Sequence, residues 1–283
     1  MSTRSRGGLA ILLASVVASA CTAPGGPTAA TTTVTETASA TTTASPTTVT
    51  PSPVTVTETA PTPAADGPGG TSTAGASSPT LDVLESLPVK GRAPRTGYDR
   101  AQFGQAWSDA VEVDGGHNGC DTRNDVLRRD LAAITLDPST GGCVVLTGTL
   151  QDPFTSTTIS FVRGRDTSRE VQIDHLVALS NAWQTGAQQL GAQQRENLAN
   201  DPLNLLAVHG SANAHKGDGD AATWLPRTSF RCDYAARQVA VKQRYDLWVT
   251  PPEHDALTRI LDSCPGQPLP TPAGTGVPAR GAP

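Results

Sequence analysis

An acid and a histidine stand side by side in VQIDHLVALS (residues 171–180), in a chain with only five histidines. Two asparagines and a lysine follow: Asn204 in DPLNLLAV, then Asn213 and Lys216 in SANAHKGDGD. Phosphodiester hydrolysis needs a base that activates water and a hard cation that stabilises negative charge on the phosphate and the leaving oxygen. His175 can be the base, because a usual pKa of about 6.5 leaves much of an imidazole neutral near neutral pH.

Asp174 and Asn213 are the candidate metal ligands. A carboxylate and an amide oxygen, with water and phosphate completing the coordination, suit Mg²⁺ or Mn²⁺ better than Zn²⁺. His215 is the competing ligand, but residues two apart on a helix point about 200° from each other, so a metal beside Asn213 cannot also take His215. The hard-cation preference set by Asp174 favours Asn213. Lys216, three residues further on the same helical face, is expected to contact phosphate.

These residues and their phrases resemble HNH endonucleases of the ββα-metal type, in the variant where Asp-His replaces His-His and Asn replaces the final His, as in the HNH domain of the CRISPR RNA-guided nuclease. The block from Tyr98 to Cys264 is also similar to exported bacterial proteins of the GmrSD C-terminal HNH family, whose members carry IDH-V-AL, NDPLNLLAV and KGDGDAATWLP phrases. The resemblance implies a metal-dependent nuclease with His175, Asn204 and Lys216 as catalytic residues and Asp174 and Asn213 as metal ligands. Asn204 would hold the loop that carries His175 rather than touch substrate.

One spacing departs from the compact HNH hairpin. His175 and Asn204 are 29 residues apart, and the excess sequence is helix-like, so an insertion between the two strands is expected. The expected fold class is α+β, with a ββα-metal HNH core embedded in a mostly helical, disulfide-bonded domain.

Two functions from different classes remain open. The first is a nuclease that acts outside the cytoplasm as a monomer on DNA, or on RNA. The second is a catalytically inactive HNH-fold surface lipoprotein that binds nucleic acid or an envelope polymer. The presence of the base, both ligands and the central asparagine favours the enzyme.

The first twenty residues indicate export. Arg4 and Arg6 precede an apolar run, Gly7 to Ala20, which is too short to span a bilayer and is typical of a signal peptide. Cys21 follows at once, as in a bacterial lipoprotein signal. The expected protein is therefore either lipid-anchored through Cys21 on the outer face of the cell membrane, with no other membrane contact, or secreted after ordinary cleavage.

Cysteine usage agrees with an oxidising compartment. Of the five cysteines, removing Cys21 leaves an even set suited to two disulfides. We expect Cys120–Cys143, which would pin a helix to a β-hairpin, and Cys232–Cys264, which would bridge the outer ends of a closing helical hairpin.

Composition divides the chain into four segments. Residues 1–20 are the signal peptide, and 21–81 begin with the lipidated cysteine and continue as a tether rich in Thr, Pro and Ala, which has too few large apolar residues to fold. The nuclease domain occupies 82–264. A tail rich in Pro and Gly, expected to be disordered, occupies 265–283.

Periodicity and turn residues predict the elements of the domain. Helices are expected over 98–111, 120–131 (capped by Asp121 or Thr122), 211–217 (capped by Ser211), 234–248 and 251–261, with helical segments between 177 and 200. A hairpin is expected from strands 143–150 and 157–164, and two further strands over 171–174 and 202–208, the last containing Asn204.

The domain has a net negative charge, so a polyanion could bind only at a local cluster of basic residues. From Arg95 to Cys264, 16 Lys and Arg residues stand against 21 Asp and Glu residues. The candidate basic clusters are Arg163, Arg165 and Arg169, and then Arg227, Arg231, Arg237, Lys242 and Arg244. Other assignments are less specific. Asp218 and Asp220 are interpreted as turn residues rather than extra acidic ligands, and Arg123 and Asn124 either line the cleft or cap a helix. The four tryptophans fit core packing better than base stacking.

Overall fold

The computed structural model describes residues 78–165 and 167–271, all within one compact unit. The predicted signal peptide, Cys21, nearly all of the tether and the end of the tail lie outside these residues. The described helices are α1 (Pro79–Ser86), α2 (Thr122–Asp130), α3 (Leu179–Gln184), α4 (Ala192–Asn200), α5 (Gly210–Lys216), α6 (Arg231–Arg244) and α7 (Pro251–Asp262). The described strands are β1 (Leu131–Leu136), β2 (Val145–Gln151), β3 (Thr158–Val162), β4 (Val171–His175) and β5 (Leu205–His209). Over the same residues, we find no helix whose length and hydropathy would allow it to span a membrane.

A two-stranded antiparallel ribbon of β4 and β5 carries the site. Its register runs from Val171 opposite His209 to His175 opposite Leu205, and α5 begins directly after β5. The helices α3 and α4 fill the connection between the two strands, so the helical insertion expected from the sequence is confirmed. Along the chain the ribbon and helix therefore have the order strand, strand, helix.

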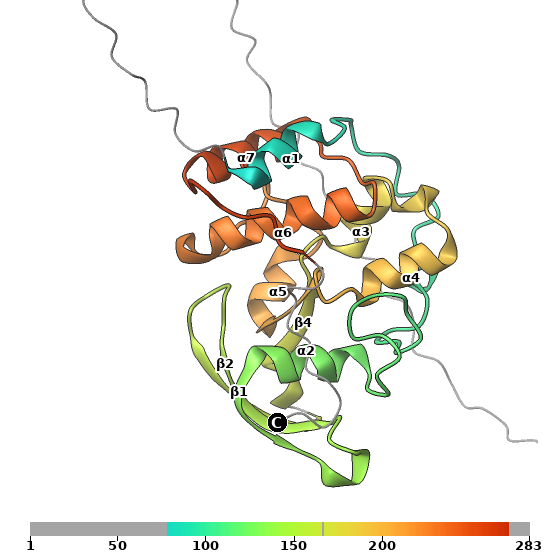
Figure 1. Ribbon diagram of the computed structural model, residues 1–283, viewed down its shortest axis with the longest axis vertical. Coiled ribbons are helices and arrows are strands. Elements are labelled where there is room, and N and C mark those ends of the chain that lie inside the picture. The colour runs from blue at the N-terminus through green and yellow to red at the C-terminus, as the bar shows by residue number, and fades with distance from the viewer. Residues whose placement is uncertain (1–77, 166, 272–283) are drawn as a thin grey trace, which may run out of the picture. The chain divides into compact units, whose positions relative to one another are not determined.

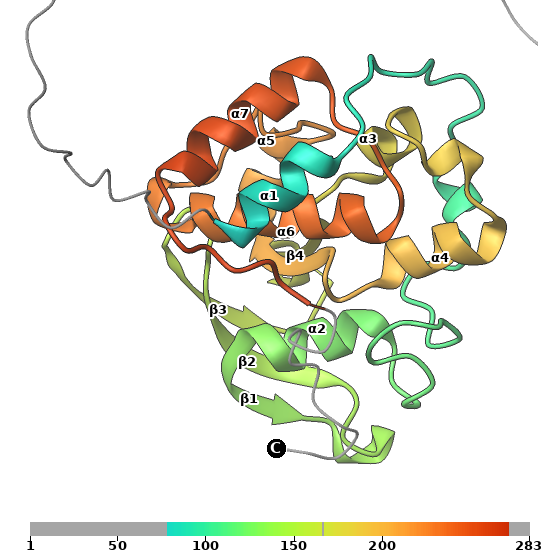
Figure 2. The same ribbon diagram turned by 45° about the horizontal axis from the view of Figure 1, so that its top comes forward.

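The ribbon lies between two apolar cores, which explains why β5 is a continuous apolar run. Leu205 and Ala207 pack with α2 and the three-stranded sheet, whereas Leu206 and Val208 pack with α1, α6 and α7. Successive side chains of a strand point to opposite faces, so burial of both faces requires apolar residues at every position. In both views β4 lies between α2 with its sheet and the layer of α1, α6 and α7 (Figures 1 and 2).

The second sheet is antiparallel with the order β1-β2-β3. The predicted hairpin is present as β2 and β3, while β1 was not expected from the sequence. The N-terminus of α2 is capped by Asp121, whose side chain accepts a hydrogen bond from the backbone N–H of Asn124. This helix packs on the ribbon and sheet through buried Val126 and Leu127.

The layer of α1, α6 and α7 closes the other side of the domain. Thr250 and Glu253 form the capping box at the start of α7, whose first two residues are prolines, as the sequence predicts. The helix α1 begins at Pro79, inside the segment that was assigned to the tether. The hydroxyls of Ser78 and Thr80 both donate to the backbone oxygen of Gln267, at 3.0 Å each, so the start of the predicted tail also contacts the domain.

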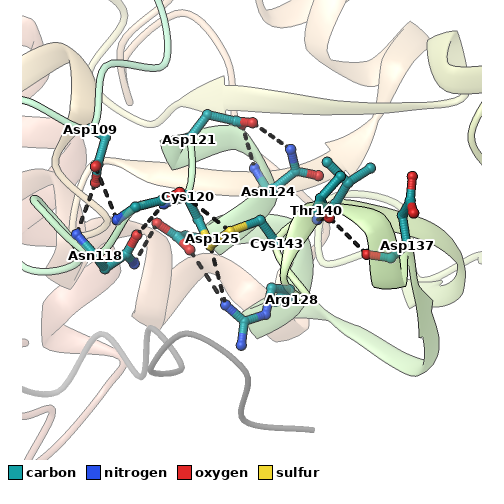
Figure 3. Close-up of a disulfide and its surroundings, with 12 residues drawn as sticks. Asp109, Asn118, Cys120, Asp121, Asn124, Asp125, Arg128, Asp137, Thr140 and Cys143 are labelled. Carbon is teal, nitrogen blue, oxygen red and sulfur yellow. Dashed lines mark hydrogen bonds and ion pairs between the residues drawn. A yellow bond between two sulfur atoms is a disulfide. The ribbon is translucent and has the colours of Figure 1, made fainter.

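Both expected disulfides are present. Cys120–Cys143 joins the segment before α2 to the segment before β2, and Cys232–Cys264 joins α6 to the end of α7. Around the first, the carboxylate of Asp125 accepts from the Asn118 amide at 3.0 Å and lies 3.7 Å from the guanidinium of Arg128 (Figure 3). Each bridge ties together segments that are distant in sequence.

The helix predicted over 98–111 is wrong. Only the short 3-10 helix Arg100–Phe103 forms there, and it ends at Gly104 with φ of 73°. A Cβ at Gly104 would lie 2.6 to 2.9 Å from side-chain carbons of Glu196 on α4, so the close approach of that helix and the positive φ both require glycine. The chain then continues as a loop, in which Trp107 has φ of 60°.

Two smaller expectations also need correction. Asn204 lies in the turn before β5 rather than within the strand. Ser211 lies inside α5, whose N-cap position is His209, and no side chain caps this helix. The tight connection from β5 into α5 leaves no intervening residue for a capping serine.

Candidate active site

Three of the residues singled out by the sequence, Asp174, His175 and Asn213, line one cavity of about 580 Å³. Asp174 and His175 enter it from the end of β4, Asn213 from α5 and Asp218 from the loop after α5. In a straight strand, neighbouring side chains point to opposite faces. Here β4 ends at His175 and the chain bends immediately, so both side chains line the cavity.

His175 is held in one orientation by two neighbours. Its Nε2 lies 2.9 Å from the backbone oxygen of Ala199 on α4, and its ring stacks on Trp107 at 15°, with the centroids 6.1 Å apart. Because a carbonyl oxygen can only accept, Nε2 must carry the hydrogen, and in a neutral ring the lone pair is then on Nδ1. Burial, reinforced by the positive charge of Arg100, lowers the pKa of His175 to about 3. The imidazole is therefore neutral at neutral pH.

Asp174 is ion-paired with Lys216. The Nζ of Lys216 lies 3.1 Å from both carboxylate oxygens and donates to the backbone oxygen of His175 at 2.8 Å. Burial raises the pKa of Asp174, and the charge of Lys216 opposes that shift. The Lys216 side chain is fully buried and does not line the cavity. The expectation that Lys216 contacts phosphate is therefore corrected: the packing of α5 against β4 directs its ammonium to Asp174.

Asn213 and Asp218 supply further oxygen atoms to the cavity. The Nδ2 of Asn213 donates to Oε1 of Gln172 at 2.9 Å, which leaves its Oδ1 as an acceptor for another partner. Asp218 accepts from the hydroxyl of Ser180 at 3.0 Å. Asp218 was interpreted as a turn residue, but it lines the cavity. Asp220 does have a structural role, since it is buried and pairs with Arg92 at 2.7 Å.

Asn204 lies beneath the cavity and is completely buried. Its Oδ1 accepts from the backbone N–H of Val177 at 2.8 Å, and its Nδ2 donates to the backbone oxygens of Val177 and Leu198, both at 3.3 Å. Its own backbone oxygen accepts from the N–H of Leu176. The side chain thus connects Val177 to α4, and the backbone oxygen of Asn204 bonds Leu176.

Three arginines line the cavity, and none belongs to the predicted basic clusters. They are Arg95, Arg100 and Arg123. Arg95 lies over the ring of Tyr98, 5.0 Å from its centroid. Burial, together with the nearby charge of Arg163, lowers the pKa of Arg123. Of the two open interpretations for Arg123 and Asn124, Arg123 lines the cavity, whereas Asn124 is buried and accepts from the N–H of Val145.

Two members of the second predicted basic cluster are structural. Arg237 donates to the backbone oxygens of Pro202, Leu203 and Leu205, and burial lowers its pKa to about 10. Lys242 has no exposed side-chain surface and lies 3.0 Å from the carboxylate of Glu253. Because both side chains bind buried acceptors inside the domain, neither is free to contact a polyanion.

The sequence did contain one signal for the missed residues. Arg95, Tyr98 and Arg100 stand in the phrase PRTGYDR, where basic and aromatic residues alternate, but the wrong helix over 98–111 assigned Tyr98 and Arg100 to a supporting element. Trp107 was assigned to the core. It is half-buried, packs partly against the core around α2 and lines the cavity through its stack on His175.

The donor atoms can be tested against the expected metal. Residues 78–165 and 167–271 form no group of three or more His, Cys, Asp or Glu side chains able to hold a metal. The candidate set is instead one carboxylate and one amide, Asp174 and Asn213, with Asp218 on the same cavity. Among the described atoms, Oδ2 of Asp174 is buried and accepts no hydrogen bond, and its neighbour is the ammonium of Lys216, 3.1 Å away in the ion pair. An all-oxygen set of this kind fits a largely hydrated hard cation and does not fit Zn²⁺.

The fold and the site define a disulfide-bonded α+β domain with a polar, arginine-lined cavity. The family model "GmrSD restriction endonucleases, C-terminal domain" matches residues 121–260. An uncharacterized secreted protein of Arthroderma benhamiae is 36% identical over 192 residues, which are 67% of this chain and 86% of that protein. The chain belongs to the family of GmrSD restriction endonuclease C-terminal domains, a nuclease family. The resemblance inferred from the sequence phrases is thereby confirmed.

Proposed function

We propose that this protein is an exported, metal-dependent HNH endonuclease that hydrolyses phosphodiester bonds of DNA, with RNA as the alternative substrate. The observation that carries the proposal is the position of His175. Its Nε2 is fixed on Ala199, and its ring shares a cavity with Asp174, Asn213 and three arginines. The strand, strand, helix order of β4, β5 and α5 supports a ββα-metal core.

His175 acts as the general base in this proposal. The neutral ring with hydrogen on Nε2 leaves Nδ1 to take a proton from the attacking water. Its depressed pKa makes free His175 a weak base. A phosphate bound near Arg100 brings negative charge that opposes the effect of that arginine, so the pKa of His175 rises when substrate is present.

Asp174 and Asn213 would hold Mg²⁺ or Mn²⁺. The ion would supply charge stabilisation at the phosphate and the leaving oxygen. Lys216 holds the Asp174 carboxylate in place from the buried side, and Asn204 holds the turn after His175. Arg95, Arg100 and Arg123 bind the phosphate backbone, since guanidinium groups form charge-assisted hydrogen bonds to phosphate oxygens.

The proposed place of action is outside the cytoplasm. Two disulfides in the domain support export, because such bonds persist in oxidising compartments. The described relative is a secreted protein. Attachment to the outer face of the membrane through Cys21, and action as a monomer, complete the proposal.

Plasmid nicking tests the function directly. The full chain should convert supercoiled plasmid to nicked or linear forms in Mg²⁺ or Mn²⁺, and EDTA should stop the reaction. His175→Ala should lower the rate by at least about 100-fold. Absence of cleavage of DNA and RNA in either metal would contradict the proposal and leave the second function, binding of nucleic acid or envelope polymer without hydrolysis.

A further inference from the structure

A second, smaller cavity adjoins the one that holds Asp174 and His175. Its volume is about 240 Å³, and four residues line both cavities: Arg100, Trp107, His175 and Leu179. The two cavities are therefore neighbours on either side of the His175–Trp107 stack. A ligand whose phosphate lies in the larger cavity would bring its next chemical group to the smaller one.

The walls of the smaller cavity are mostly apolar and aromatic. Phe103, Trp107 and Leu179 form its body, with Ala101, Ala106 and Ala199 between them. The guanidinium of Arg100 is the charged group of the wall. Aromatic rings and an arginine are the groups on which nucleobases stack, since every base has a π-face.

The backbone that builds this wall is unusual. Gly104 and Trp107 both have positive φ, 73° and 60°. Glycine adopts that region freely, whereas a bulky side chain there is rare and is found where the surrounding structure imposes it. The result is that the indole of Trp107 lies flat against the imidazole and forms part of both cavity walls.

We propose that the smaller cavity is a subsite for one unpaired nucleobase next to the scissile phosphate, so the substrate of this site is single-stranded or locally unpaired nucleic acid. The proposal rests on the proposed nuclease function and names its substrate class. At about 240 Å³ the cavity is below the ~300–1,000 Å³ of typical ligand pockets, which suits a single flat ring system rather than a whole nucleotide. A base inside a duplex is stacked on both sides and cannot enter without leaving its pair.

Binding in the absence of cleavage tests the subsite. Fluorescence anisotropy of the full chain in EDTA is measured with four fluorescein-labelled oligonucleotides: a DNA single strand, the same strand of RNA, the matching DNA duplex, and the DNA strand with its bases removed. The wild type should bind one of the base-bearing single strands at least about tenfold more tightly than both the duplex and the abasic strand. Which of the two single strands binds more tightly distinguishes DNA from RNA as the source of the base.

Ala106 lines the smaller cavity and not the larger one, so Ala106→Phe should fill the smaller cavity and lower the preference for base-bearing over abasic strand about tenfold. Ala110→Phe is the matched control, because Ala110 is also exposed and lines neither cavity, and it should keep the full preference.

Equal binding of the abasic strand and the base-bearing strands by the wild type would overturn the subsite, as would a duplex bound as tightly as the single strands. An unchanged preference in Ala106→Phe would overturn it too. These outcomes are separable from failure of the proposed function. A chain that prefers unpaired bases but cleaves neither plasmid nor single-stranded DNA or RNA in Mg²⁺ or Mn²⁺ retains the subsite and loses the nuclease. A chain that cleaves nucleic acid with no preference for base-bearing strands retains the nuclease and loses the subsite.

Discussion

The ammonium of Lys216, the last residue of α5, lies 3.1 Å from each carboxylate oxygen of Asp174 near the end of β4. Both side chains are buried, and the same ammonium donates to the backbone oxygen of His175. One lysine therefore fixes the carboxylate that is proposed to hold the metal and the backbone of the proposed base.

Replacing this lysine should destabilise the protein strongly. Lys216→Met leaves the Asp174 carboxylate buried without a partner, and breaking a buried pair in this way typically costs about 3–5 kcal/mol. The double variant Asp174→Asn, Lys216→Met removes both charges and should lose less. Urea unfolding measures the free energy of each variant. A Lys216→Met midpoint equal to that of the wild type would show that the pair does not form.

Whether Asn213 or His215 is the second protein ligand determines which metal the proposed site can bind. Asn213→Ala should lower Mg²⁺-dependent nicking by at least about 100-fold, because it removes a proposed ligand. His215→Ala is the control and should stay near wild type, since His215 is exposed and does not line the cavity of His175. The reverse result, an active Asn213 variant and an inactive His215 variant, would indicate a histidine-ligated site and make Zn²⁺ a candidate.

Asn204 should matter for stability and for catalysis together. Asn204→Ala leaves the N–H of Val177 and two backbone oxygens without their buried partner, which should cost about 2–3 kcal/mol. The turn after His175 would also be released, so nicking should fall even at temperatures where the variant is folded. Asn197→Ala, which removes two exposed hydrogen bonds, from the N–H of Glu112 and from the amide of Gln193, should stay within about 0.5 kcal/mol. Equal unfolding midpoints for the two variants would argue against the proposed role.

The disulfides should stabilise the domain to similar extents. The closed loops span 23 and 32 residues, and the loss of chain entropy in the unfolded state predicts about 3–4 kcal/mol for each bridge. Cys120→Ser with Cys143→Ser, and Cys232→Ser with Cys264→Ser, are compared with the wild type by thermal unfolding. Non-reducing peptide mapping checks the pairing, and a peptide that links Cys120 to Cys232 or Cys264 would contradict it.

Asp125 should make stability depend on pH. Burial raises its pKa to about 6, although the Asn118 amide and Arg128 oppose the shift. The unfolded carboxyl has a pKa of about 3.9, so the folded state binds the proton more tightly than the unfolded state does. The resulting contribution to the free energy of unfolding is fully present below about pH 4 and is lost as the pH rises through 6. The loss amounts to at most about 3 kcal/mol. Asp125→Asn should unfold with a smaller difference between pH 4.5 and pH 7 than the wild type, and an identical difference would refute the assignment.

The sequence predicted elements whose signals are local. The capping box of α7, the strands β2 to β5, the Asp121 cap and the helical insertion depend on nearby residues, and the structure contains them. The helix over 98–111 failed because Gly104 and the approach of Glu196, a residue on another helix, override the apolar spacing. The strand β1 was missed because its sequence follows a helical pattern without a break.

The sequence predicted which residues line the cavity better than it predicted which side chains contact each other there. Asp174, His175 and Asn213 do line one cavity. The phosphate role of Lys216 was inferred from helical spacing alone, and spacing does not say which face of α5 packs on β4. Arg95 comes from the loop before the 3-10 helix Arg100–Phe103, Arg100 from that helix and Arg123 from α2, so only the tertiary fold brings the three arginines together.

The contact of Ser78 and Thr80 with Gln267 has a mechanical consequence. The described chain enters and leaves the domain at one place, which Cys232–Cys264 braces against α6. A pulling force applied through the residues before Ser78 would first load α1, whose contacts are with α6 and α7. The ribbon of β4 and β5 packs on the same apolar core through Leu206 and Val208, so tension on the chain would reach the cavity of His175 only through that core.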